Sequence, residues 1–410
     1  MLADRETRHS ATVVTFMNVA HATDHFFMLI FPTAVLAMEH ELGLGYGELL
    51  SLALGGFIAF GAGSIPAGWL GDRWSRRNMM AVFFLGIGAA SIATGFTTTT
   101  LGLAIGLTVI GLMAAIYHPV GTAMLAGHAR QLGRAIGTNA VWGNMGVASA
   151  AFVTGALVDA FSWRMAFIAP GVVAMLVGIA FLARVPESLP RLGKTGTTGE
   201  RLPRSLMVRV FAVLIFVTLA NGVVFNAITV SLPKAFDERV ALLVQGGTFG
   251  VGALVAIVYV IGATSQVIIG RLIDRHSLKS VFVPLALLPA PCLLLATFAE
   301  GWVVVGLVAV AVFGVFGQVT INDSMVARYT ADAWRSRAYA VRYLVSFGAS
   351  GIAVPLIAAL HGFGDRFATA YLALAGFALL VFLGAIAFPG SRDAGGRGVV
   401  SPRVSVSVPP

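Results

Sequence analysis

Residues 68–77 read GWLGDRWSRR, and residues 270–275 read GRLIDR, so a Gly-x-x-x-Asp-Arg pattern occurs twice, 202 positions apart. Each copy follows directly after a long apolar stretch of the chain. Two further pairs of arginines keep the same spacing to within one residue: Arg134 with Arg337, and Arg164 with Arg366. Three matches in the same order at a nearly constant offset indicate an internal duplication, which is typical of transporter architectures.

The stretches between these motifs are apolar enough to cross a membrane. Hydrophobic residues make up 58% of the 410 residues and charged residues 11%, whereas a soluble domain carries about 25% charge. At about 20 residues per span, twelve stretches qualify: 12–38, 48–70, 79–97, 99–126, 135–160, 164–184, 209–234, 246–270, 279–299, 301–327, 337–361 and 366–388. Since lipid offers no partner for backbone amides, helix is the expected structure. The predicted fold is an all-α membrane protein of about twelve transmembrane helices in two six-helix halves.

Two polar segments divide the chain. Residues 185–208, VPESLPRLGKTGTTGERLPRSLMV, are rich in Pro, Gly and Thr, and we expect them to form a cytoplasmic linker. This linker separates an N-terminal half at 1–184 from a C-terminal half at 209–388. The tail at 389–410 is polar and rich in Gly, Pro and Ser, and we expect it to be disordered on the cytoplasmic side.

Basic residues predict the orientation of the spans. With both termini inside, cytoplasmic segments hold 22 of the 27 Lys and Arg residues, and external loops hold Arg164, Lys234, Arg239 and Arg366, whereas Arg342 falls within a span. Because positive charge is retained on the cytoplasmic side, we expect a multi-pass protein of the cytoplasmic (inner) membrane with both termini cytoplasmic. The basic residues that give the net charge of +9 would then lie on the cytoplasmic face, where they can contact anionic lipid of the bilayer. This distribution argues against nucleic acid as a partner.

The motif at 68–77 resembles the signature loop between the second and third helices of the major facilitator superfamily, and the resemblance extends over residues 12–388. In that family the loop latches the cytoplasmic gate, so the resemblance implies a gating role. The residues that would carry this role in the two copies are Gly68, Asp72, Arg73, Arg77, Asp274 and Arg275. The alternative is that these charges only mark the cytoplasmic side and a turn.

A finer resemblance rests on the first, fourth and fifth stretches. His21 and Asp24 lie in the first, an aromatic-His-Pro sequence occupies 117–119 in the fourth, and Asn144 lies in a Gly-Asn-Met-Gly sequence in the fifth. Together these look like the fosmidomycin-resistance branch of the superfamily. The branch implies export of a small organic molecule or drug.

The first stretch carries titratable side chains where charge is costly. His21, Asp24 and His25 have the spacing i, i+3 and i+4, so they share one face of a helix. Two imidazoles beside a carboxylate could take up and release a proton near neutral pH, although a static hydrogen-bonded cluster is the alternative. The same three groups with His118 could ligate zinc, but the resemblance provides no reason for a metal, and we expect no metal and no cofactor.

In the second half, polar residues gather in the tenth and eleventh stretches. The repeat places Asn322 and Asp323 at the depth of His118, as expected for a site at the interface between repeats. Arg342 could bind an anionic substrate through its planar guanidinium, or could form an internal salt bridge with Asp323. The predicted pathway for substrate and protons has these members: His21, Asp24, His25, Tyr117, His118, Asn144, Gln318, Asn322, Asp323 and Arg342.

The expected function is secondary transport by alternating access in a monomer, with proton-linked export of a small, anionic organic molecule. Import of an organic acid or another nutrient is the alternative, because sequence does not define the direction. A membrane-embedded enzyme or sensor is the alternative of another class. We do not expect an enzyme, because the sequence has no nucleotide-binding loop, zinc-protease motif or nucleophile elbow.

Overall fold

The computed structural model describes residues 2–129, 131–187, 204–240, 247–330, 332–363 and 367–390. Within these ranges all the regular structure is helical, and twelve helical spans are long and apolar enough to cross a membrane. Each of the twelve predicted stretches overlaps one of these spans, which confirms the expected fold class. Parts of the predicted linker (188–203) and tail (391–410) lie outside the described residues.

The first six spans comprise nine helical elements. They are α1 (Leu2–Leu42), α2 (Tyr46–Leu52) with α3 (Leu54–Arg73), α4 (Arg76–Gly95), α5 (Thr100–Ala114) with η1 (Tyr117–Gly121) and α6 (Thr122–His128), α7 (Leu132–Ala160) and α8 (Trp163–Arg184). The fourth span contains a π-helical turn, η1, at Pro119. Proline lacks the amide hydrogen that a regular helix needs, and such π-turns often occur at functional sites.

The second six spans comprise eight elements. They are α9 (Arg204–Val240), α10 (Gly247–Arg275), α11 (Leu278–Leu287) with α12 (Pro289–Ala296), α13 (Gly301–Tyr329), α14 (Asp332–Gly348) with α15 (Ser350–His361) and α16 (Ala368–Ala387). Helix α9 begins at Arg204, so residues 204–208 are helical although we predicted them as part of the linker. The rest of the domain division stays a prediction.

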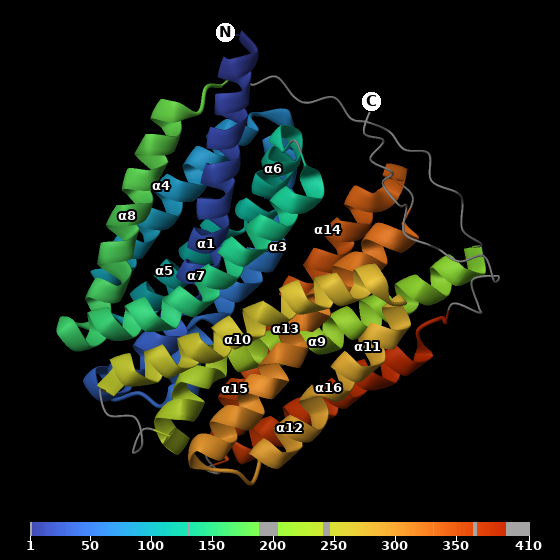
Figure 1. Ribbon diagram of the computed structural model, residues 1–410. Helices are drawn as coiled ribbons and strands as arrows, with labels where there is room; N and C mark the ends of the chain where they lie inside the picture. The colour runs from blue at the N-terminus through green and yellow to red at the C-terminus, as the bar shows by residue number, and fades with distance from the viewer. Residues whose placement is uncertain are drawn as a thin grey trace.

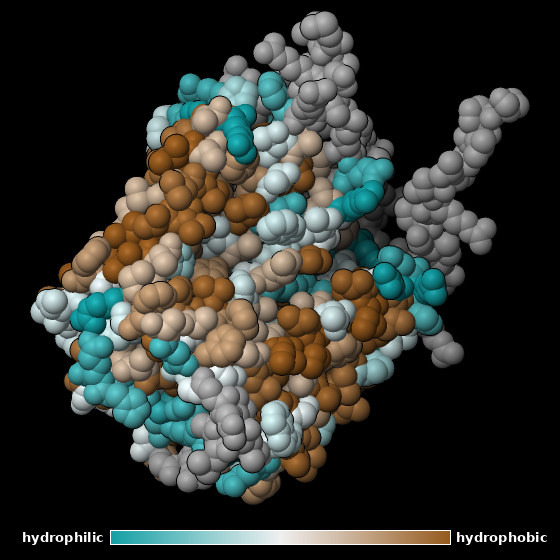
Figure 2. Space-filling view, turned by 60° about the vertical axis from the view of Figure 1, so that its left-hand side comes forward, coloured by the Kyte–Doolittle hydropathy of each residue, from teal (hydrophilic) through white to brown (hydrophobic). Residues whose placement is uncertain are grey.

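The outer surface suits lipid. Large apolar side chains such as Leu176 and Ile257 are 60% and 58% exposed, which would be a liability in water. Figure 2 shows hydrophobic residues over the flanks of the molecule and hydrophilic residues gathered toward its ends.

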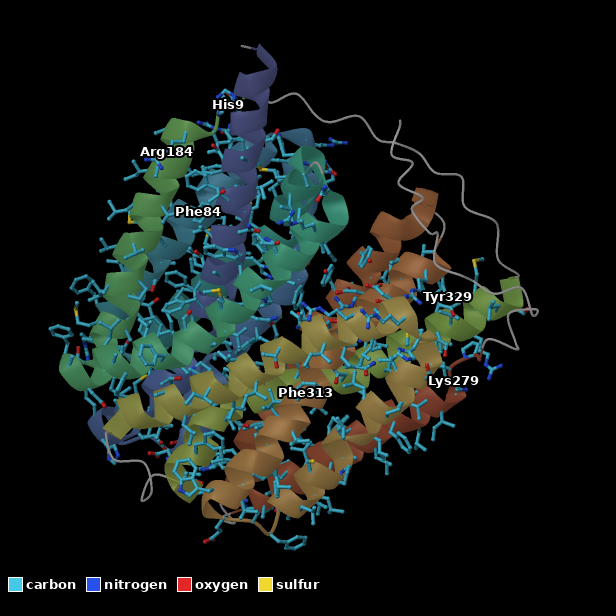
Figure 3. The ribbon with its side chains drawn as sticks, viewed as in Figure 1. His9, Phe84, Arg184, Lys279, Phe313 and Tyr329 are labelled. Carbon is cyan, nitrogen blue, oxygen red and sulfur yellow. The ribbon has the colours of Figure 1, made fainter. Side chains whose placement is uncertain are left out.

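The spans form two bodies, α1–α8 and α9–α16, which converge at one end and diverge toward the end where α1 begins and α16 ends (Figure 1). At the converging end, the carboxylate of Glu39 lies 2.6 Å from Lys234, and the Tyr46 hydroxyl donates to the Val230 carbonyl. Figure 3 shows Arg184 at the diverging end of the first body and Lys279 at that of the second. The described contacts thus close the converging end of the bundle, opposite the start of α1.

Helices α1 and α7 pack against each other through glycine. A methyl group on Gly146 would collide with the Ala22 carbonyl oxygen, and one on Gly143 would lie 2.6 Å from the His21 ring. Such small residues let helix backbones approach closely in a membrane protein. This contact holds α1, and with it His21, against α7.

We expect Gly146→Ala to destabilise the protein by about 1–3 kcal/mol, because the added methyl group collides with the α1 backbone. Thermal unfolding of the purified protein in detergent measures the effect. Gly137→Ala is the matched control on the same helix, since nothing lies within 4 Å of the position of its methyl group. The control should be neutral or slightly stabilising, because alanine favours helix over glycine by about 1 kcal/mol. If Gly146→Ala unfolds at the same temperature as Gly137→Ala, the close α1–α7 contact is wrong.

Candidate functional site

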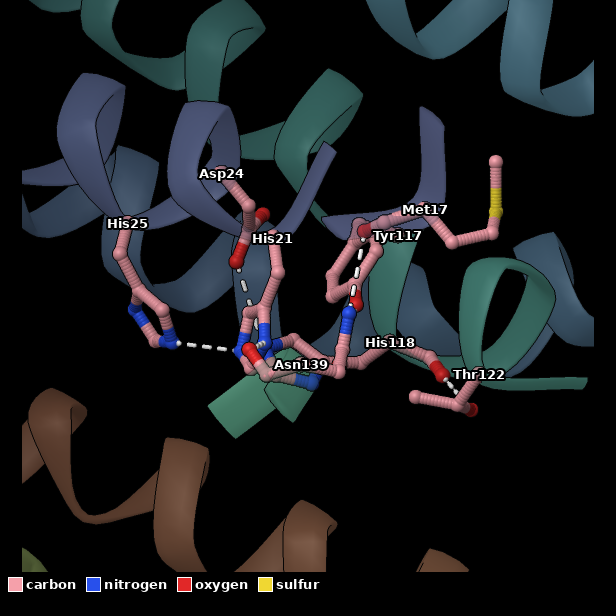
Figure 4. A network of polar contacts seen from close by, with 8 residues as sticks. All are labelled: Met17, His21, Asp24, His25, Tyr117, His118, Thr122 and Asn139. Carbon is pink, nitrogen blue, oxygen red and sulfur yellow. Dashed lines mark hydrogen bonds and ion pairs between the residues drawn. The ribbon is translucent and has the colours of Figure 1, made fainter. Parts of the chain in front are cut away.

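Four titratable side chains meet between α1 and η1 (Figure 4). The predicted face of α1 presents His21, Asp24 and His25 together, and the His118 ring of η1 lies 5.4 Å from that of His21 and 5.6 Å from that of His25. The His118 Nε2 atom is 3.3 Å from Asp24 Oδ2. The structure therefore brings together His21, Asp24, His25 and His118, the four residues of the predicted pathway in the first half that are histidine or aspartate.

Two of the histidines form a chain of hydrogen bonds with a defined direction. The Nδ1 atom of His21 lies 2.8 Å from the main-chain carbonyl oxygen of Asn139. A carbonyl only accepts, so Nδ1 of His21 carries the hydrogen. In the neutral ring Nε2 of His21 is then an acceptor, and it receives the Nε2 hydrogen of His25 at 3.1 Å.

Asp24 is the most deeply placed charge of the cluster. Its side chain is fully buried, and neither carboxylate oxygen has a hydrogen-bond partner among the described residues. The 3.3 Å approach to His118 is close enough for an ion pair but lies outside hydrogen-bond geometry. An isolated carboxylate in such surroundings is costly, and the His118 imidazole lies close enough to compensate its charge when protonated.

Asn139 of α7 ties the cluster together, and the sequence analysis missed it. Its side-chain amide donates to the Met17 carbonyl and to the side-chain oxygen of Asn18, both at 3.1 Å. Its side-chain oxygen accepts from the Tyr117 hydroxyl at 2.8 Å. Spacing could have identified Asn139, because it precedes Gly143, which faces α1, by one helical turn.

A second polar cluster lies in the other body, on α13 and α14. The Nη1 atom of Arg342 is 3.1 Å from Asp323 Oδ1, so the salt bridge that was one of two alternatives for Arg342 is present. The arginine side chain is only 3% exposed, whereas that of Asp323 is 37% exposed. The guanidinium also lies 4.8 Å from the centre of the Tyr343 ring. Arg342 is thus a buried cation with one partly accessible counter-ion.

Gln318 and Asn322 form a separate pair on α13. The Gln318 amide donates to the side-chain oxygen of Asn322 at 3.1 Å, and both side chains are buried. They therefore bond to each other in this conformation. Among the described hydrogen bonds, none joins either of them to Arg342 or Asp323.

Aromatic rings join the two polar clusters across the two bodies. The His118 ring lies 5.6 Å from Tyr343 and 4.6 Å from Phe347 of α14. Phe60 of α3 lies 4.6 Å from Phe347 and 5.8 Å from His118. We call Phe60, His118, Tyr343 and Phe347 the aromatic bridge. Phe60 and Phe347 carried no signal in the sequence, because phenylalanine is ordinary in an apolar helix.

Asn144 also reaches the other body, at a different place. Its amide donates to the side-chain oxygen of Gln266 on α10 at 3.0 Å. This residue therefore links α7 to α10. Its described hydrogen bond does not involve a residue of the histidine cluster.

The residues of the predicted gating loop bond within their own body in this conformation. Asp72 pairs with Arg76, one turn further on, at 2.5 Å, and Arg73 lies over the Trp69 ring at 4.8 Å. Arg77 donates to the main-chain carbonyls that end α8, those of Leu182 and Val185, at 2.8 Å each.

The remaining residues of the two copies of the predicted loop motif lie in different surroundings. Gly68 packs against Pro119, where an added methyl group would lie 3.1 Å from the proline ring. Asp274 and Arg275 of the second copy are exposed at the end of α10. A gating role for these residues stays a prediction.

Comparisons with known proteins show what the chain is similar to. The sequence pattern described as Major Facilitator Superfamily matches residues 16–321. The 4-hydroxybenzoate transporter PcaK of Pseudomonas putida is 26% identical over 226 residues, which cover 53% of this chain and 48% of PcaK. The niacin transporter NiaP of Acinetobacter baylyi is 30% identical over 148 residues, which cover 35% of this chain and 33% of NiaP. The chain thus spans half or less of the length of these two relatives.

A solved structure shares the fold. It is described as a bacterial homolog to the human lysosomal transporter Spinster in an inward-facing and unoccupied conformation. The two chains superpose with a TM-score of 0.70 at 15% sequence identity, covering 93% of this chain and 98% of the other.

A double-mutant cycle tests the anchoring role of Asn139. Asn139→Ala should destabilise the protein by about 2–4 kcal/mol, since it removes hydrogen bonds to three buried groups, while Tyr117→Phe should cost about 1 kcal/mol. Adding Tyr117→Phe to Asn139→Ala should cost almost nothing more, because the hydroxyl has already lost its acceptor. Chemical unfolding of the purified proteins measures the three changes. Strictly additive effects would show that the two residues do not interact.

Proposed function

We propose that this chain, which belongs to the Major Facilitator Superfamily, takes up a small aromatic carboxylate together with protons. Its family makes it a membrane transporter rather than an enzyme. The observation that carries the proposal is the position of Arg342, a buried cation stacked on Tyr343, next to a fully buried carboxylate-histidine pair in the other body.

The site around Arg342 suits a substrate that is both anionic and aromatic. A guanidinium binds a carboxylate with two parallel hydrogen bonds, and the partly exposed Asp323 can give way to a competing carboxylate. The rings of Tyr343 and Phe347 stack 5.8 Å apart beside it, and such faces pack well against another ring. The compounds in the names of the two relatives, 4-hydroxybenzoate and niacin, are single aromatic rings with one carboxylate, which supports this substrate class.

We place the coupled proton on the Asp24–His118 pair. Moving one negative charge inward against an inside-negative potential costs about 2.3 kcal/mol per 100 mV, and a proton carried along cancels that charge. His118 belongs both to the proton pair, through Asp24, and to the aromatic bridge that reaches Tyr343. Loading of the substrate site can therefore be sensed at the proton site through one side chain.

The separation of the two sites supports uptake over export. An antiporter requires proton and substrate to exclude each other, most simply at one shared group. Here the carboxylate of Asp24 and the guanidinium of Arg342 have different partners, His118 and Asp323, so both sites can be filled at once. The export that we expected from the fosmidomycin-resistance resemblance gives way to uptake, and the membership of that branch stays a prediction.

The conformation fits alternating access. With both termini placed in the cytoplasm by the distribution of basic residues, the end closed by Glu39 and Lys234 faces outward. The diverging end then faces the cytoplasm (Figure 1), and the loop with Asp72 does not contact the second body through any described ion pair. We propose that this is the inward-facing state, in which that loop is released.

The substrate role of Arg342 is tested by three variants. Arg342→Lys should keep the fold but weaken binding of 4-hydroxybenzoate or niacin about tenfold or more, because a charge-assisted hydrogen bond contributes about 1.5–3 kcal/mol. Arg342→Ala should lose binding and stability, since Asp323 is left without its partner. Adding Asp323→Ala to Arg342→Ala should restore stability but not binding. Ligand affinity and thermal unfolding of purified protein measure both effects. Normal affinity in Arg342→Ala would contradict the anion site.

The proton role of Asp24 is tested by Asp24→Asn in proteoliposomes. The variant should no longer accumulate substrate when an inward pH gradient is imposed, because it lacks the carboxylate that carries the proton. It should still exchange internal for external labelled substrate, since exchange needs no net proton movement. A variant that concentrates substrate as well as the wild type would remove Asp24 from the proton pathway.

A further inference from the structure

Three imidazoles of the first body are close enough to hold one metal ion. The ligand atoms of His21, His25 and His118 all lie within 4.8 Å of one another. His118 is buried, whereas His21 and His25 are partly exposed, which leaves a route by which an ion can enter. Figure 4 shows the His25 ring pointing at the ring of His21, and Asp24 beside His118.

Two of the distances between donor atoms match those of a tetrahedral site. Zinc bonds to nitrogen and oxygen of about 2.0–2.1 Å place neighbouring ligands roughly 3.3–3.4 Å apart. The Nε2 atoms of His21 and His25 are 3.1 Å apart, and Nε2 of His118 is 3.3 Å from Asp24 Oδ2. Two of the ligand pairs therefore already have the spacing that a bound ion imposes.

The surroundings orient His21 as a ligand. Its Nδ1 hydrogen is bound by the Asn139 carbonyl at 2.8 Å, which directs Nε2 toward the cluster. Metal-bound histidines almost always donate their other nitrogen in this way, and the contact fixes both tautomer and ring orientation. Gly143 packs directly against the same ring, so the ring is held in place from both sides.

Unsatisfied atoms provide an independent indication. Both oxygens of Asp24 and the Nε2 atom of His118 are buried and, among the described residues, have no hydrogen-bond partner. Buried polar atoms without partners are rare in native proteins, and a bound ion or water beside them is one explanation. A single cation between Asp24 and His118 would satisfy atoms on both residues.

We propose that His21, His25, His118 and Asp24 form a binding site for one divalent transition-metal ion, with zinc the first candidate. Three imidazole nitrogens and one carboxylate suit Zn²⁺, Co²⁺, Ni²⁺ and Cu²⁺, whereas Mg²⁺ and Ca²⁺ prefer oxygen ligands. The expectation of no metal, drawn from the sequence, is revised because the sequence did not show how close these four groups lie.

Metal and proton compete for the same atoms. A bound ion requires neutral imidazoles and an ionised carboxylate, so binding releases protons. If Asp24 has the proposed proton role, micromolar zinc blocks proton-driven uptake, because the ion occupies the proton site. The metal is then an inhibitor that holds α1 and η1 together.

Binding is measured with Co²⁺ on the purified, tag-free protein, through the visible absorption that Co²⁺ acquires in a tetrahedral site. We expect one Co²⁺ per chain, displaced by Zn²⁺ and not by Mg²⁺. His25→Gln and His118→Gln should each weaken binding by about tenfold or more. His276→Gln, which alters an exposed histidine at the end of α10, is the matched control and should bind like the wild type.

Thermal unfolding with and without Zn²⁺ shows whether each variant folds. Zn²⁺ should raise the unfolding temperature only of a folded protein that has the site. Wild-type Co²⁺ affinity in both His25→Gln and His118→Gln, or absence of Co²⁺ absorption in the wild type, overturns the metal site. If Co²⁺ binds as expected but zinc leaves proton-driven uptake unchanged, the competition is wrong and the site stands. If no metal binds while Asp24→Asn is uncoupled, the proposed transport function stands without the metal site.

Discussion

The cost of placing charge among apolar helices determines the arrangement of this structure. Asp24 and Arg342 lie deep within the two bodies, where an unpaired charge is expensive. Each has a group of opposite charge within reach on a neighbouring element: Arg342 pairs with Asp323 of α13, and Asp24 lies 3.3 Å from His118 of η1, which is a cation when protonated. Neither pair is fully satisfied by hydrogen bonds among the described residues. The proposed binding of a proton, a metal ion and a substrate depends on these unsatisfied atoms, which remain available to another partner.

Backbone irregularity and close helix packing bring these groups into register. Pro119 lies within the π-turn η1, where the adjacent residues Tyr117 and His118 reach different partners, Asn139 and Asp24. Gly143 lets α7 approach α1 closely enough for the neighbouring Asn139 carbonyl to orient His21. The π-turn and the absence of a side chain at Gly143 thus determine which polar groups meet in the histidine cluster.

The aromatic bridge relates this chemistry to movement of the two bodies. His118 belongs to the first body by its chain position and touches Tyr343 and Phe347 of the second. A relative rotation of the bodies must change these contacts, and with them the surroundings of the Asp24 carboxylate. The coupling of substrate and proton that we propose would need no long pathway, because the His118 imidazole contacts both Asp24 and the rings of Tyr343 and Phe347.

The sequence by itself determined the features that are local or compositional. Twelve apolar stretches, the repeat of residues 68–77 at 270–275 and the shared face of His21 and Asp24 follow from hydropathy, spacing and the helical period. Contacts between distant segments came only from the tertiary structure. It brought Arg77 to the Leu182 carbonyl of α8, showed the anchoring role of Asn139, and brought Phe60 and Phe347 to His118. The physical reason is that pattern defines which face a residue occupies, whereas its partner depends on how the helices pack.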